Sequence, residues 1–157
     1  MKLRLLALTI AVGGSALFAG CGSKSDTLAM SGSAKNFTMD PKYKEFCGAY
    51  DTLNLSLDAL AKEGSSKEAF ADVLAKSKKL VDIAPADVQA AVASNDAILN
   101  AMNHVFSQHN YDEKKVTSDE EVKKQIQALY AQEGLADLAT KYADYLIKNC
   151  GISTAGK

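Results

Sequence analysis

The chain has 157 residues, with 18 lysines and arginines against 19 aspartates and glutamates, which gives a net charge of −1 at pH 7. This balance provides no strongly basic face, so nucleic acid is not an expected partner. Tryptophan is absent and aromatic residues make up only 7% of the chain, so the residues that most often line deep pockets are scarce.

Residues 1–20 have the layout of a secretory signal peptide. Lys2 and Arg4 precede an uncharged stretch over residues 5–20 that ends in small residues. That stretch is short for a membrane-spanning helix, which needs about 20 apolar residues. A retained N-terminal anchor helix is the alternative to a cleaved signal.

The segment Phe18-Ala19-Gly20-Cys21 resembles a bacterial lipobox, with phenylalanine where leucine is commoner. The resemblance implies cleavage before Cys21, which then carries a diacylglyceryl group and often a third acyl chain such as palmitate. Two acyl chains anchor a protein stably. We therefore expect a lipoprotein held by Cys21 at the extracytoplasmic face of the cell membrane.

The remaining 137 residues are enough for one domain. Residues 21–39 are rich in Ser, Gly and Lys and lack an apolar period, which predicts a flexible tether. Residues 40–152 are expected to form a helical bundle, and residues 153–157 a disordered tail.

The first helix is predicted to begin at Asp40-Pro41, an N-cap followed by proline at the first helical position, and to end at Gly64. Apolar residues recur there at helical spacing, from Phe46 to Leu60. A capping box of Ser65 with Glu68 predicts the second helix.

A third helix is expected from Pro85, and the joint before it is so short that it predicts either a tight turn or one kinked rod. Residues 110–118 are predicted to form a polar loop, after which Ser118 with Glu121 makes another capping box. Gly134 interrupts the last helix, which ends at Cys150-Gly151. The expected fold is an all-α, up-and-down bundle of four helices, the last one broken near Gly134.

Cys47 lies near the start of the first helix and Cys150 at the end of the last. In an up-and-down bundle with an even number of helices these two ends meet, and an exported protein can form disulfides. We therefore predict a Cys47–Cys150 disulfide that staples the bundle. Two free buried cysteines are the alternative.

The arrangement also resembles a group of small exported actinobacterial lipoproteins, in which a lipobox and polar tether precede a cysteine-paired helical domain. The residues that carry this resemblance are Phe46-Cys47 and Cys150-Gly151-Ile152. The resemblance implies a fold and a location, and it implies no particular activity.

Candidate chemistry is sparse. His104 and His109 are five residues apart, so they do not share a helix face as metal ligands would. No catalytic motif is present, so we expect no enzyme, no metal and no cofactor. Tyr50, Tyr142 and Tyr145 could line a small aromatic cleft, or they could be tyrosines at the edge of the core.

These features favour a non-enzymatic interaction or binding module at the cell envelope, whose partner would be an envelope protein. The alternative is a carrier that holds a small apolar ligand between its helices.

Overall fold

The computed structural model describes residues 37–152, whose regular secondary structure is helical, without β-strands. After the 3-10 turn η1 (Pro41–Tyr43) come α1 (Lys44–Glu63), α2 (Lys67–Asp82), α3 (Gln89–Gln108), α4 (Glu113–Ser118), α5 (Glu120–Tyr130) and α6 (Leu135–Cys150). The predicted helical class is confirmed, but these residues form six α-helices where four were expected. The predicted signal peptide, the Cys21 lipid site, most of the tether and the tail lie outside the described residues.

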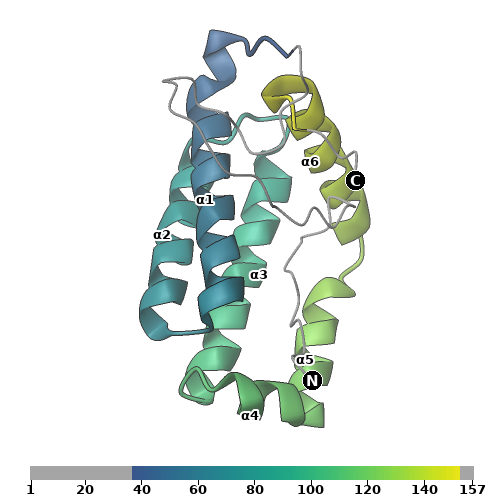
Figure 1. The fold of residues 1–157 in the computed structure, drawn as a ribbon. Coiled ribbons are helices and arrows are strands. Elements are labelled where there is room, and N and C mark those ends of the chain that lie inside the picture. The colour runs from purple at the N-terminus through teal and green to yellow at the C-terminus, as the bar shows by residue number, and fades with distance from the viewer. Residues whose placement is uncertain (1–36, 153–157) are drawn as a thin grey trace.

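The helices lie roughly parallel to one long axis. In Figure 1, α1, α2 and α3 stand side by side, and each runs antiparallel to the helix before it. The short α4 crosses one end, and α5 and α6 then follow one another along the far side of α3. The start of α1 and the end of α6 consequently lie at the same end of the molecule.

Apolar side chains form two packed clusters, one toward each end. The cluster at the end where α6 stops joins α1, α2, α3 and α6, and it includes Phe46, Val73, Leu80, Val92, Leu99 and Leu146. The cluster at the α4 end includes Phe70, Ile98, Met102, Phe106, Val116, Val122 and Ile126. Leu60 packs against both clusters, so the core is continuous along α1.

The joint between α2 and α3 is a turn, and the two helices are separate. The backbone N–H of Val88 donates to the carbonyl of Pro85, and that turn delays the start of α3 until Gln89. The expectation that the third helix begins at Pro85 is therefore wrong by four residues. Of the two alternatives left open by the sequence, the tight turn is the one that forms.

The cap of α2 is Ser66, whose hydroxyl accepts from the N–H of Ala69, and the predicted cap at Ser65 is wrong. A tertiary contact explains the difference. The backbone N–H and the hydroxyl of Ser65 both donate to the carboxylate of Glu113, at 3.2 and 3.1 Å. Ser65 thus ties the α1–α2 turn to α4 and leaves Ser66 to cap the helix.

The predicted loop at residues 110–118 contains α4, and this changes the cap of the next helix. Asp119 caps α5 by accepting from the N–H groups of Glu121 and Val122. The hydroxyl of Ser118 instead donates to the carbonyl of Lys115 within α4. The predicted capping box at Ser118 is therefore wrong.

Glycine ends or separates helices where the sequence indicated. Gly64 follows α1 with φ +96°, and its N–H donates to the carbonyl of Leu60. Gly134, with φ +77°, stands between α5 and α6, so the predicted break in the last segment is confirmed. Glycine adopts such positive φ values with less strain than residues that carry a side chain.

Candidate functional site

Cys47 and Cys150 form the predicted disulfide. Their Cα atoms are 5.5 Å apart, and the bond joins the first turns of α1 to the last residue of α6. Both residues are fully buried. The alternative of two free thiols is excluded, and no nucleophilic thiol remains at these two positions.

The three tyrosines of the predicted cleft gather beside the disulfide, between α1 and α6. Tyr50 meets Tyr142 edge to face, with ring centroids 5.8 Å apart and planes at 89°. Phe46 packs in the same manner against Tyr142 and Tyr145, at 6.5 and 5.7 Å. Tyr43 then covers Tyr145 at 5.8 Å. The rings form a packed aromatic cluster, an arrangement that stabilises beyond the area it buries.

Burial keeps the phenols of this cluster neutral. Desolvation raises the pKa of Tyr142 well above its ordinary value, and the negative charge that Tyr50 would carry acts in the same direction. Burial also raises the pKa of Tyr50, against the effect of a hydrogen bond with Asn54. The raised pKa values of Tyr50 and Tyr142 therefore argue against a phenolate nucleophile at either residue.

Tyr145 borders a surface hollow. The hollow has a volume of about 320 Å³ and lies between η1, the α2–α3 joint and α6. Its lining consists of Tyr43, Asp87, Val88, Lys141, Asp144, Tyr145, Lys148 and Asn149, and we call it the terminal hollow. The side chain of Tyr145 is 8% exposed, and its buried hydroxyl has no hydrogen-bond partner within the described chain.

A second hollow, of about 400 Å³, lies along the seam between α1 and α2. It is lined by Ser56, Ala59, Leu60, Glu63, Gly64, Ser65, Ser66, Ala69 and Asp72, and we call it the seam hollow. Within its lining, the hydroxyl of Ser56 donates to the carboxylate of Asp72 at 2.7 Å. Lys76 reaches both groups, at 2.5 Å from Ser56 Oγ and 2.6 Å from Asp72 Oδ2.

This serine–aspartate–lysine cluster is a structural contact between helices. A Ser–Lys catalytic pair needs a lysine free to take the serine proton, whereas Lys76 is engaged in an ion pair. Hydrogen bonds from Lys76 and then from Ser56 lower the pKa of Asp72, which keeps that carboxylate charged. The sequence pattern did not reveal the cluster, because Ser56 and Asp72 lie 16 residues apart on different helices.

The two histidines are placed as surface and capping residues. His104 is exposed on α3, with Nε2 3.2 Å from the amide nitrogen of Gln108. His109 is the C-cap of α3. No group of histidine, cysteine and carboxylate side chains within residues 37–152 is arranged to hold a metal ion.

No protein-family model, no curated protein and no solved structure matches this chain. Among the described helices, none combines the length and the apolar character needed to cross a bilayer.

Proposed function

We propose that this protein is a lipid-anchored, extracytoplasmic binding module of the cell envelope without enzymatic activity. The observation that carries the proposal is the Cys47–Cys150 disulfide. Stable disulfides belong to oxidising compartments, in agreement with an export signal in residues 1–20. The bond also uses two of the three cysteines in the sequence, and the third, Cys21, is the one in the lipobox-like segment.

In its finer form, the proposed fold is an up-and-down bundle of four rods. The successive helices α5 and α6 would form one interrupted rod, with α4 as the connection at the end of the bundle. This description fits the antiparallel order of α1, α2 and α3 in Figure 1. Such a bundle presents rigid side faces to a partner.

A binding surface is favoured over an internal carrier site by the packing between α1 and α6. Aromatic rings from both helices contact one another there, in the region where an apolar ligand would need space. The two hollows lie at the surface, and each is lined by polar and charged groups as well as by apolar ones. An envelope protein or a polar envelope component is consequently the proposed partner, and native mass spectrometry of the purified protein tests for a retained apolar molecule.

The anchor is tested by Cys21→Ser. We expect the wild-type chain in the membrane fraction, with a mass that includes a diacylglyceryl group, and the variant without that mass and released or uncleaved. The matched control is Cys47→Ala with Cys150→Ala, which removes two other cysteines and should leave the lipid mass unchanged. Identical fractionation and mass for wild type and Cys21→Ser would contradict the proposal.

The binding role is tested by chemical crosslinking in intact cells that produce either the wild type or Cys21→Ser. We expect one recurring adduct that depends on anchorage, because a tether raises the effective concentration of the module near an envelope partner. Repeated absence of any adduct, with both proteins equally abundant, would contradict a role in binding envelope components.

A further inference from the structure

One side of α1 turns away from the core and exposes a leucine. Leu55 is 60% exposed, more than any other large apolar side chain among the described residues. Gly48, Thr52, Leu55 and Ala59 follow one another at steps of four, three and four residues, so they lie on one side of the helix. None of the four belongs to either apolar cluster. We call these four residues the outer face of α1.

Gly48 has no internal packing reason to be glycine. It lies within α1, where every residue except proline is more favourable than glycine. A β-carbon at residue 48 would meet no atom of a neighbouring element of the described chain within 4 Å, and the residue has no positive φ. Because glycine has no side chain, a backbone from outside can approach closely at such a position. The outer face is therefore open to a helix from another molecule.

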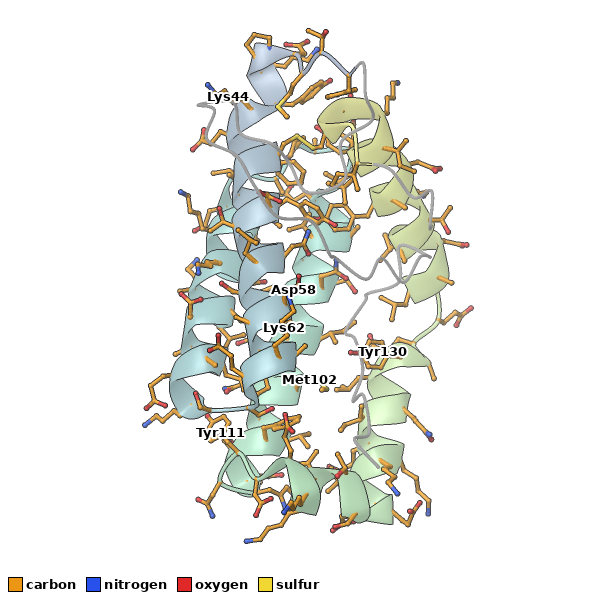
Figure 2. All side chains as sticks on the ribbon, viewed as in Figure 1. Lys44, Asp58, Lys62, Met102, Tyr111 and Tyr130 are labelled. Carbon is orange, nitrogen blue, oxygen red and sulfur yellow. A yellow bond between two sulfur atoms is a disulfide. The ribbon has the colours of Figure 1, made fainter. Side chains whose placement is uncertain are left out.

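Charged residues stand at both ends of the outer face, in the same order. Lys44 and Glu45 precede it, Lys62 and Glu63 follow it, and all four side chains are exposed. Figure 2 shows Lys44 at one end of α1 and Lys62 near the other. Lys62 also forms an ion pair with Asp58 at 3.8 Å, but so exposed a pair is weak and does not hold the ammonium group in place. Each end of the face therefore presents one ammonium and one carboxylate group.

The order of these charges fits a second copy of the same helix, packed antiparallel about a two-fold axis. In such a pair Lys44 of one copy can lie level with Glu63 of the other, and the axis repeats that contact. The same register brings Glu45 level with Lys62, again twice. A shift by one residue in either direction would instead bring the two lysines or the two glutamates level with each other. Charge therefore selects a single register.

In this register the outer face also fits itself in shape. Leu55 of each copy lies over Thr52 of the other, so the two leucines pack beside each other at the centre of the contact. Gly48 of each copy lies level with Ala59 of the other. Small residues at these outer positions allow the two helix backbones to approach closely enough for the leucines to meet.

We propose that the outer face of α1 is the surface through which two copies of this chain associate, with their α1 helices antiparallel. A single pair of helices buries less area than a standard protein interface, and Asp51 and Asp58 of the two copies approach one another along one edge. The dimer is consequently weak and forms at high local concentration. The inference goes beyond the proposed envelope-binding role, since it requires neither an envelope partner nor Cys21.

The test is a zero-length crosslink with a water-soluble carbodiimide, applied to the full-length chain in detergent micelles. The reagent takes up one water as a touching carboxyl and amino group condense to an amide. We expect peptides that join Glu45 to Lys62 and Lys44 to Glu63. Glu45 and Lys62 lie about 25 Å apart along one helix, so this amide cannot form within one copy. In a mixture of ¹⁴N and ¹⁵N chains, the joined peptides should contain both isotopes.

Variants of the outer face separate association from folding. Leu55→Gln should lower the yield of joined peptides at least about 5-fold, because it removes the one large apolar contact. Ile147→Gln is the matched control, since Ile147 is an exposed apolar residue on α6, and the yield should stay unchanged. Gly48→Leu should lower the yield as well. It should also raise the urea midpoint of the single chain, because leucine is a better helix former and has space there.

Charge reversals test the register. Glu45→Lys and Lys62→Glu should each lower, several-fold, the yield of the amide between Lys44 and Glu63, because each brings like charges level with each other. The variant with both reversals should restore that yield, since the two charges are then exchanged. A general effect of charge on folding or aggregation would not be reversed in this way.

Three results would overturn the proposal. One is the absence of joined peptides at about 1 mM protein, where even a dissociation constant in the millimolar range gives a detectable dimer. Another is a yield that Leu55→Gln does not lower, which would identify random collisions. The third is a double charge reversal that does not restore the yield. None of these results depends on membrane fractionation or on adducts with envelope proteins, so a failure here and a failure of the proposed function can be told apart.

Discussion

The ring of Phe37 lies against Gly151, in the space that a β-carbon at residue 151 would occupy. Gly151 also has a left-handed backbone, with φ +67°, as the C-cap of α6. The segment that precedes η1 and the residue that follows the disulfide are therefore packed together. Glycine at this position meets two separate requirements, one of backbone conformation and one of space.

Gly151→Ala should lower the free energy of unfolding by about 2–4 kcal/mol, from backbone strain and from the clash with the ring. In a Phe37→Ala background only the strain remains, so the same substitution should cost about 1–2 kcal/mol. Urea denaturation of the four proteins of this double-mutant cycle measures both values. Equal losses in the two backgrounds would show that the ring does not restrict residue 151.

The disulfide closes a loop of 103 positions, and in the chain-entropy relation a loop of this length contributes about 4–5 kcal/mol. Replacing both cysteines by alanine should therefore lower the free energy of unfolding by about 4 kcal/mol. Alanine is preferable to serine because both sites are fully buried and would leave a serine hydroxyl unsatisfied.

The control for this prediction is the wild type unfolded in the presence of a reductant, which should match the double alanine variant. Intact mass before and after reduction should differ by two hydrogen atoms. A loss of stability below about 1 kcal/mol would mean that the unfolded chain gains little freedom when the bond is removed.

The Ser56–Asp72–Lys76 cluster predicts a specific acid dependence. Hydrogen bonds from Lys76 and Ser56 lower the pKa of Asp72 in the folded protein, below the ordinary value of 3.8 that this carboxyl has in the unfolded chain. The stabilisation is therefore present above that value, and it is lost as the pH falls through the folded-state pKa. Urea midpoints at pH 5, 4 and 3 should decrease less steeply in Asp72→Asn than in the wild type.

Asp58→Asn is the matched control for that series. Asp58 pairs with Lys62 along the outside of α1 at 3.8 Å, the same helical spacing as Asp72 and Lys76 (Figure 2). Removing this more distant, exposed pair should change the acid dependence less. Equal changes in the two variants would show that the contact with Ser56 adds nothing to an ordinary surface pair.

The turn after α3 contains two consecutive non-glycine residues with positive φ, Asn110 at 53° and Tyr111 at 58°. The N–H of Tyr111 donates to Phe106 and that of Asn110 to Ser107, which is the Schellman pattern of a helix end. Asparagine tolerates this conformation better than other non-glycine residues. Asn110→Ala should therefore cost about 1 kcal/mol, whereas Asn110→Gly should stay within about 0.5 kcal/mol of the wild type.

Thermal and urea unfolding of these two variants measure the difference directly. The comparison separates the backbone requirement from any role of the asparagine side chain. If alanine and glycine were equally unfavourable, the side chain and not the conformation would be responsible.

Local patterns in the sequence were sufficient for the helical class, for the disulfide and for the glycine boundaries at Gly64 and Gly134. These features depend on spacing along one helix or on which ends of the chain meet. The predicted N-cap residue was wrong where a tertiary contact engages the side chain that would have capped the helix. Ser65 satisfies the capping-box pattern, but Glu113 from a distant helix engages its hydroxyl, so Ser66 caps α2.

The candidate sites were harder to predict from the sequence, because they too depend on contacts between residues that are distant along the chain. The tyrosines were correctly placed on facing helices, and both Tyr142 and Tyr145 lie in the packed rings. Only the structure shows that the hydroxyl of Tyr145 is buried without a hydrogen-bond partner among the described residues. In the sequence, Asp87 and Lys148 look like ordinary surface charges. In the fold, the α2–α3 joint and α6 lie together, so both residues line the terminal hollow. Contacts between residues so distant in sequence leave no periodic pattern.

Tyr130 gives a prediction in which deleting a polar group does not destabilise the protein. It packs near the end of α5 against the cluster that contains Met102 (Figure 2), and its hydroxyl is buried without a partner among residues 37–152. Tyr130→Phe removes that unsatisfied group and keeps the ring, so stability at pH 7 should be equal to the wild type or higher by about 1 kcal/mol. Tyr111→Phe is the control, because the hydroxyl of Tyr111 donates to Asn103 at 3.1 Å and its loss should cost about 1 kcal/mol.

Tyr130 also predicts the direction in which the free energy of unfolding changes at alkaline pH. Burial raises the pKa of Tyr130 to about 12, from 10.0 in the unfolded chain. The unfolded chain therefore loses its proton first, and the stabilisation that is present below pH 10 is lost as the pH rises toward 12. Between these values the urea midpoint should fall more steeply in the wild type than in Tyr130→Phe. Parallel decreases would show that the phenol of Tyr130 reaches solvent in the folded protein, since an accessible hydroxyl would ionise equally in both states.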